Sequence, residues 1–239
     1  MNEMNLGGMV GEPLPYLLRS DGLITCIMFL CMALVAFVVA REKKYLYHQL
    51  KSFISSRERP SMFDEVTMAD MRYTFLLLLH TCVLIGFCLY YYSSENSTHL
   101  FAGISHGSLL LGFIVLVAAV LLFKIGVYKF INWIFFQKSR NMIWVNAYFN
   151  VLIWMGLLLL PVVLLIIYFG LSSQTAFYLV GGIIIFAKIA LFCKCFTNFF
   201  GKIHGLVHLI LYFCALEILP DLMVWKGIEI VSNNLTLNI

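Results

Sequence analysis

The sequence predicts an all-α polytopic membrane protein, a bundle of about six transmembrane helices joined by short loops. The 239 residues are 62% hydrophobic and only 12% charged, whereas a soluble domain usually carries about 25% charged residues. The apolar stretches are continuous and do not alternate with polar residues, which favours membrane helices over the strands of a barrel. We interpret residues 1–239 as a single transmembrane domain.

Six stretches are long enough to span a bilayer, since a helix needs about 20 mostly apolar residues to cross about 30 Å of hydrocarbon. They are Leu23–Ala40, Tyr73–Tyr92, Ile104–Tyr128, Met142–Phe169, Ala176–Phe196 and Ile203–Trp225. The first connection, residues 41–72, is longer than the others and amphipathic. In it, Tyr45, Leu46, Leu50, Phe53 and Ile54 recur at helical spacing among lysines, which predicts an interfacial cytoplasmic helix.

Basic residues concentrate on one side of the predicted spans. Besides loop 41–72, the later connections on that side carry Lys124, Lys129, Lys138, Arg140, Lys194 and Lys202. The opposite side has only Arg19 and Lys226. Because loops rich in lysine and arginine stay in the cytoplasm, we expect both termini to lie outside it. The basic groups of the first loop are expected to contact anionic lipid headgroups or another membrane protein, or to act as a plain surface anchor; they are Lys43, Lys44, Lys51, Arg57 and Arg59.

The sixth predicted span contains two carboxylates, Glu217 and Asp221, on either side of Pro220. An ionisable side chain inside a bilayer costs about 2.5–3.5 kcal/mol, so both residues need an explanation. Pro220 has no backbone donor and frees the carbonyl of Leu216. That carbonyl and the carboxylate beside it form a candidate proton or cation site. The alternative is that Glu217 is a buried hydrogen-bonding strut.

Lys188 is the candidate partner of Glu217. By helical rise, Lys188 lies about 15 Å and Glu217 about 21 Å from the cytoplasmic face. Side chains tilt toward the N-terminus of their own helix, and these two helices run in opposite directions, so the two side chains tilt toward each other. We predict an intramembrane ion pair. The alternative is that Lys188 extends to the cytoplasmic interface.

Two further pairs of polar residues are spaced four apart, on one helix face each. His204 and His208 begin the sixth span, and Asn146 and Asn150 begin the fourth. We interpret the asparagines as interhelical hydrogen-bonding groups and the histidines as hydrogen-bonding groups at the membrane interface. The spacing of the histidines can also bind a metal, but no third ligand accompanies them. We therefore expect neither a metal nor a cofactor. The sequence also lacks Gly-x-Ser-x-Gly, His-Glu-x-x-His and phosphate-loop motifs, so we expect no enzyme activity and no nucleic-acid binding.

The run Leu211–Pro220 resembles the closing signature of an uncharacterised Bacteroidetes integral-membrane family, domain of unknown function 4271. The cytoplasmic segment with Phe53 and Ser56-Arg57-Glu58-Arg59 is similar to the first loop of that family. The resemblance covers about Leu23–Trp225. It implies a bacterial inner membrane, with both termini then periplasmic, and implies no activity. Asp221 stands where the family leads us to expect an apolar residue, so the resemblance gives it no role.

Two functions from different classes fit these observations. The first is a non-enzymatic subunit or assembly factor of a cell-envelope complex, favoured by the small parts outside the membrane. The second is a small proton- or ion-coupled transporter that uses Glu217, which requires a polar cavity reaching that carboxylate. The two hypotheses therefore differ in the environment that they predict for Glu217.

Overall fold

The computed structural model describes residues 18–54, 68–96, 105–135, 138–199 and 213–237. All regular structure in these residues is helical, as the sequence predicts. A short 3₁₀ turn precedes the first long helix, and a π-helical segment precedes the last. The elements are η1 (Leu18–Ser20), α1 (Gly22–Arg41), α2 (Lys43–Ile54), α3 (Met68–Asn96), α4 (His106–Phe135), α5 (Lys138–Phe169), α6 (Ser173–Phe199), η5 (Cys214–Ile218) and α8 (Leu219–Leu237).

Five of the described helices, α1, α3, α4, α5 and α6, are long and apolar enough to cross a membrane. The chain is therefore a membrane protein with an all-α bundle. The sixth predicted span, Ile203–Trp225, begins outside the described residues, and its described part consists of η5 and the first turns of α8. The helices run past several predicted boundaries, since α4 continues to Phe135 and α8 to Leu237.

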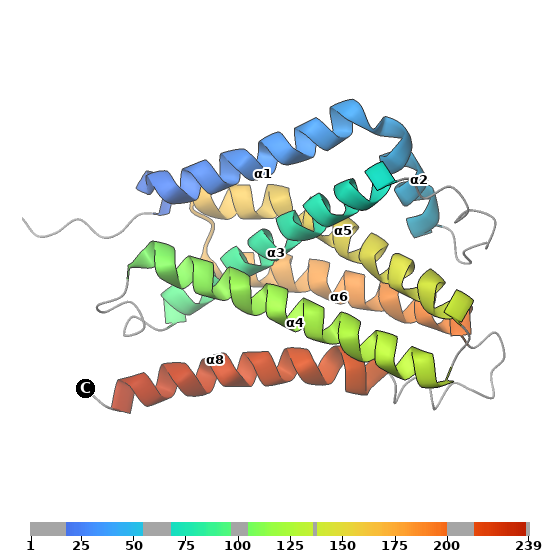
Figure 1. Cartoon of the computed structure of the whole chain (residues 1–239). Helices are drawn as coiled ribbons and strands as arrows, with labels where there is room; N and C mark the ends of the chain where they lie inside the picture. Colours follow the sequence, from blue (N-terminus) through green and yellow to red (C-terminus); the bar gives the residue numbers. More distant parts are fainter. Residues whose placement is uncertain (1–17, 55–67, 97–104, 136–137, 200–212, 238–239) are drawn as a thin grey trace, which may run out of the picture.

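Helix α5 lies at the centre of the bundle and packs against α3 on one side and α6 on the other (Figure 1). Helices α3 and α5 are in tight contact at Gly156, where an added Cβ would lie 2.1 Å from Thr81 Oγ1. The Thr81 hydroxyl donates to the carbonyl of Leu77, 2.9 Å away, and also lies 3.3 Å from the carbonyl of Leu152. A small residue such as this glycine allows the backbones of two membrane helices to come close to each other.

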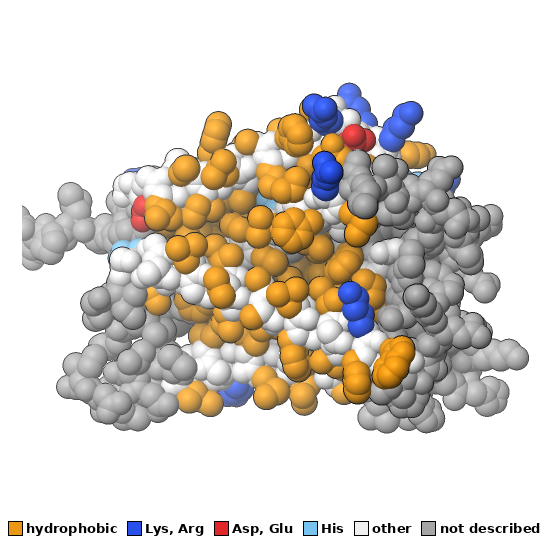
Figure 2. Space-filling model, viewed as in Figure 1, with side chains coloured by type: hydrophobic (Ala, Val, Ile, Leu, Met, Phe, Trp, Pro, Cys, Tyr) orange, Lys and Arg blue, Asp and Glu red, His pale blue; other side chains and the backbone are white. Residues whose placement is uncertain are grey.

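The two ends of the bundle differ in composition. Figure 1 shows the start of α1 and the end of α8 at one end of the bundle, and α2 at the other. Figure 2 shows hydrophobic side chains over the middle of the visible face, with most of the visible lysine and arginine near the end that holds α2. This arrangement agrees with the distribution of basic residues in the sequence, from which we placed the 41–72 connection on the opposite side of the membrane from the termini.

The predicted amphipathic helix of the first loop is present as α2, and it is tied to the bundle by side chains from α5 and α6. Asn150 donates from Nδ2 to the carbonyl of Gln49 over 3.0 Å, and Lys194 donates from Nζ to the carbonyl of Ser52. The last four carbonyls of a helix have no partner within it, and that of Ser52 is one of them, so Lys194 caps the C-terminal end of α2. Asn150 binds a carbonyl further from that end. Phe53 packs its ring against that of Trp154 at 6.1 Å.

One part of the charge assignment is corrected by this contact. We counted Lys194 among the basic residues of a cytoplasmic connection, but it is a buried residue of α6. Its ammonium group lies at the C-terminal end of α2, where the helix dipole favours a positive charge. Lys194 is therefore a packing residue that positions α2, and the exposed lysines of α2 are Lys43, Lys44 and Lys51.

Candidate functional site: a charge cluster inside the bundle

The last helix begins, in its described part, with a widened turn. From Cys214 to Ile218 the backbone is π-helical, and the N–H of Leu219 donates to the carbonyl of Cys214, five residues back. Such π-segments are rare and often occur at functional sites. From the sequence we expected a break in the helical hydrogen bonding here because of Pro220, which has no N–H of its own. Lys124 Nζ lies 3.2 Å from the backbone carbonyl of Glu217 and donates to it.

Glu217 is completely buried, with 0% of its surface exposed. Its Oε2 accepts hydrogen bonds from Lys188 and from Lys124, the latter at 3.2 Å. Its Oε1 accepts a hydrogen bond of 2.7 Å from the hydroxyl of Tyr128. Both carboxylate oxygens are thus bound by side chains from α4 and α6. A buried charge needs partners of this kind, because it is otherwise strongly destabilising.

Asp221 completes the site one turn further along the chain. Its Oδ1 lies 2.6 Å from Lys124 Nζ, and its Oδ2 lies 2.7 Å from Lys188 Nζ. Two lysines and two carboxylates therefore form a neutral charge cluster, which we define as Lys124, Lys188, Glu217 and Asp221. The cluster joins α4, α6 and the last helix, three elements far apart in the sequence.

The cluster lies far from the C-terminal ends of α4 and α6. Lys124 and Lys188 each lie about 16 Å from the C-terminal ends of their helices, by the rise of an α-helix. Exposure increases from one edge of the cluster to the other, because Glu217 and Lys124 are buried while the side chains of Lys188 and Asp221 are 26% and 44% exposed. The cluster is thus closed on the side of Glu217 and reaches the surface at Asp221.

The structure brings together all three residues that the sequence placed in the intramembrane site, Glu217, Lys188 and Asp221. It also adds Lys124 and Tyr128, which we had not placed in the site. Lys124 was counted as a loop charge, but it is buried inside α4. The spacing of Lys124 and Tyr128, one helical turn apart, is the sequence signal that could have identified them.

The remaining predicted polar residues lie elsewhere. Asn150 is buried and holds α2, and Asn146 is half-buried one turn before it. Four residues fall outside the described part of the chain, namely His204, His208, Arg57 and Arg59. Within the described ranges, no three His, Cys, Asp or Glu side chains come together as a possible metal site.

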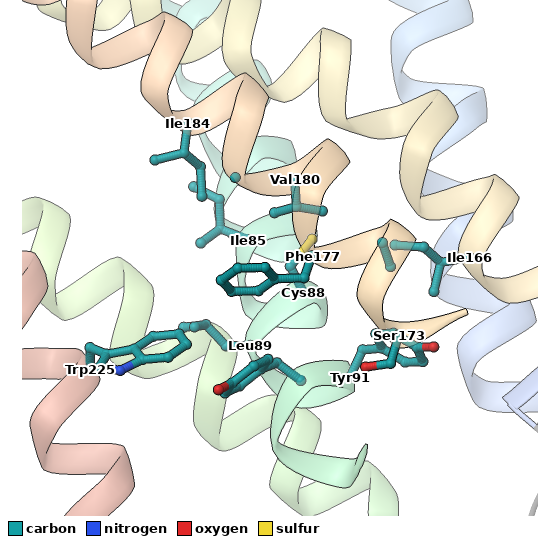
Figure 3. A pocket seen from close by; sticks show the side chains of 13 residues that line it. Ile85, Cys88, Leu89, Tyr91, Ile166, Ser173, Phe177, Val180, Ile184 and Trp225 are labelled. Atoms are coloured by element: carbon teal, nitrogen blue, oxygen red, sulfur yellow. The ribbon is translucent and has the colours of Figure 1, made fainter. Parts of the chain in front are cut away.

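An apolar pocket of about 120 Å³ lies beside the cluster, lined by residues of α3, α5, α6 and α8. Figure 3 shows Phe177 and Ile184 on α6 and Trp225 on α8 around it. Trp225 also packs its ring against that of Tyr92 on α3, with the ring centroids 4.7 Å apart. Since Ile184 is one turn before Lys188 and Trp225 one turn after Asp221, the pocket lies one helical turn from the exposed edge of the charge cluster.

Comparison with known proteins places the chain in a family. Residues 24–228 match the model of the family described as Domain of unknown function (DUF4271), and since this match covers most of the chain, the chain belongs to that family. No curated protein and no solved structure matches the chain. The family assignment agrees with the resemblance seen at Leu211–Pro220.

Proposed function

We propose that this member of the DUF4271 family is a non-enzymatic subunit or assembly factor of a cell-envelope complex in a bacterial inner membrane. The observation that carries the proposal is the closed environment of Glu217. Each carboxylate oxygen has a donor within 3.2 Å from Tyr128 or Lys124, and the side chain is fully buried. A buried carboxylate with hydrogen-bond donors on both oxygens is better suited to holding helices together than to taking up and releasing a proton.

The surroundings of the cluster support the same choice. The pocket beside it is apolar and is lined by Trp225, Ile184 and Phe177, among others, so it offers a cation no polar path toward Glu217. Much of the bundle surface is apolar, and exposed large hydrophobic side chains cover α1, α4 and α6. These surfaces suit contacts with lipid and with other membrane helices, and we propose no cofactor, metal or nucleic-acid partner.

The test is purification of the tagged full-length chain from membranes of its own host in a mild detergent, followed by native electrophoresis. We expect the chain to run in a complex with other membrane proteins in constant ratio over independent preparations. A chain that always runs alone, or with proteins whose ratio varies freely, contradicts the proposal.

A proton- or ion-coupled transporter remains the second candidate, and one observation favours it. The exposed edge of the cluster, formed by Lys188 and Asp221, reaches the surface of the bundle beside a π-helical turn. Reconstitution in liposomes with a pH-sensitive dye inside distinguishes the two functions. Proton flux that depends on the purified protein and disappears in Glu217→Gln supports transport, whereas equal leakage in both supports the structural role.

We further propose that α2 contacts anionic lipid headgroups through Lys43, Lys44 and Lys51, which are exposed on it. Each lysine near an anionic surface contributes about 1 kcal/mol to such an interaction. Hydrogen exchange of α2 should therefore be slower in nanodiscs with anionic lipid than in zwitterionic ones. The difference should disappear when all three lysines are replaced by glutamine, and a difference that persists argues against the contact.

A further inference from the structure

The contact between α2 and α5 includes two buried polar atoms that have no hydrogen-bond partner within the described residues. They are Oδ1 of Asn150 and Nε1 of Trp154. Asn150 has 2% of its surface exposed, and Trp154 is half-buried although its Nε1 is fully covered. Buried polar atoms are nearly always bonded to protein or to ordered water, so this pair needs an explanation.

Both side chains contact the same turn of α2. Asn150 and Trp154 are four residues apart in α5 and therefore lie on one face of that helix. Asn150 donates from Nδ2 to the carbonyl of Gln49 over 3.0 Å, and the Trp154 ring packs against that of Phe53 with the centroids 6.1 Å apart. Gln49 and Phe53 are in turn four residues apart in α2. One turn of α5 thus lies against one turn of α2, and the two atoms belong to side chains of this contact.

The two atoms are complementary in their hydrogen-bonding chemistry. The amide oxygen of Asn150 only accepts, and the indole N–H of Trp154 only donates. The carbonyl of Gln49 fixes the orientation of the Asn150 amide, because a carbonyl can bond only to its nitrogen end. Oδ1 and Nε1 are not bonded to each other. One group satisfies both if it donates to Asn150 and accepts from Trp154.

Water is the smallest ligand that meets both requirements. It donates and accepts at the same time, and a buried water makes about two to four hydrogen bonds to otherwise unsatisfied groups. A metal cation offers no acceptor to the indole N–H, and a simple anion offers no donor to Asn150. The surroundings are polar as well, since Gln49 Nε2 lies 3.2 Å from the Tyr45 hydroxyl, which lies 2.7 Å from Thr74 Oγ1.

We propose that a water molecule bound between α2 and α5 bridges Asn150 Oδ1 and Trp154 Nε1. It forms a further polar link between α2 and the bundle, beside the hydrogen bonds from Asn150 to Gln49 and from Lys194 to Ser52. The docked position of the amphipathic helix then depends on a hydration site. This inference goes beyond the proposed function and does not rest on it, because it concerns contacts within the chain.

The first test is nuclear magnetic resonance of the full-length chain in detergent micelles, with isotope-labelled tryptophan side chains. A long-lived bound water gives an indole proton nuclear and rotating-frame Overhauser effects of opposite sign, whereas direct proton exchange gives the same sign in both. We expect effects of opposite sign at Trp154, whose signal is identified by its loss in Trp154→Phe. In Asn150→Leu they should disappear, because the water loses one of its two partners.

Hydrogen exchange of the α2 amides, which reports local opening of the helix, is the second test. Trp154→Phe keeps an aromatic ring beside Phe53 and removes the donor, so exchange should become about fivefold faster, equivalent to about 1 kcal/mol. The matched control is Trp133→Phe, which removes an indole on α4 that is 76% exposed and should leave α2 unchanged. Combining Asn150→Leu with Trp154→Phe should accelerate exchange by less than the product of the single effects, since both act on one water.

Each of four results would overturn the inference. They are the absence of water effects at Trp154 in the folded wild type, effects that persist in Asn150→Leu, equal α2 exchange in Trp154→Phe and Trp133→Phe, and a double variant whose acceleration equals the product of the single ones. If Asn150→Leu does not fold, the comparison of Trp154→Phe with Trp133→Phe still decides. None of these measurements depends on whether a complex forms, so failure of the proposed function is seen separately in native electrophoresis.

Discussion

Lys124 bridges the two carboxylates of the last helix, with Nζ 3.2 Å from Glu217 Oε2 and 2.6 Å from Asp221 Oδ1. Lys188 contacts the same two residues from α6. Every member of the charge cluster therefore has two oppositely charged neighbours. This arrangement makes the effect of each substitution depend on which charges remain, so that single and double variants have different expected stabilities.

The first prediction concerns removal of one charge or of a balanced pair. Lys188→Met and Glu217→Gln should each destabilise the protein by about 3–5 kcal/mol, because each leaves a buried charge uncompensated. The double variant leaves the Lys124–Asp221 pair intact at 2.6 Å and should recover much of that loss. The free energy of unfolding, measured by titrating mixed micelles with dodecyl sulfate, checks this.

The control removes both cations. Lys124→Met combined with Lys188→Met leaves Glu217 and Asp221 without a positive partner in the cluster and should be less stable than either single variant. Lys226→Met, which alters an exposed pair with Glu229, should change stability by about 0.5 kcal/mol or less. Strictly additive losses for Lys188→Met and Glu217→Gln would show that the two charges are not coupled.

The second prediction isolates the Tyr128 hydroxyl. Tyr128→Phe keeps the ring and removes the 2.7 Å hydrogen bond to Glu217 Oε1. A hydrogen bond to a charged group is worth about 1.5–3 kcal/mol, so the free energy of unfolding should fall by about that amount. Tyr178→Phe removes an exposed hydroxyl and should have little effect. Equal stabilities of the two variants would contradict the importance of this bond.

The sequence predicted the fold class and part of the cluster for identifiable physical reasons. Continuous apolar runs can only be helices in lipid, and the opposite directions of the fifth and sixth spans made Lys188 and Glu217 tilt toward each other. Lys124 was missed because helix ends are uncertain from sequence. The predicted third span ended at Tyr128, whereas α4 continues to Phe135, which moves Lys124 from near the membrane surface into the interior.

The contacts of α2 show a different limit. Periodicity predicted the helix, since it depends only on neighbouring residues. Asn150 and Lys194, which donate to carbonyls of α2, are far away from it in sequence, and no local pattern shows which distant side chain will reach a given carbonyl. Predictions of this kind require the packing of α5 and α6, which the sequence of one chain does not reveal.

The third prediction concerns the tight contact between α3 and α5 at Gly156. In Gly156→Ala the new methyl group would lie 2.1 Å from Thr81 Oγ1 and 2.9 Å from its Cβ, so α3 and α5 must separate. Overpacking of this kind costs about 1–3 kcal/mol, measurable as a lower thermal transition in detergent. Gly126→Ala, where the added Cβ meets no atom within 4 Å, is the control. Adding Thr81→Ala to Gly156→Ala should restore part of the lost thermal stability. If it restores none, the contact with the Thr81 side chain is not the cause of the loss.

The last prediction tests the proposed orientation, with both termini in the periplasm. Reassigning Lys124 and Lys194 to the interior leaves the charge bias in place, because loop 41–72 and residues 129–140 remain basic. After the exposed cysteines Cys26, Cys193 and Cys214 are replaced, single cysteines are introduced at Asn96, Asn233 and Ser55. A membrane-impermeant maleimide applied to cells with a permeabilised outer membrane should label the first two and not the third. If the cysteine at position 55 is labelled in those cells as fast as after the inner membrane is also permeabilised, the orientation is opposite to the proposed one.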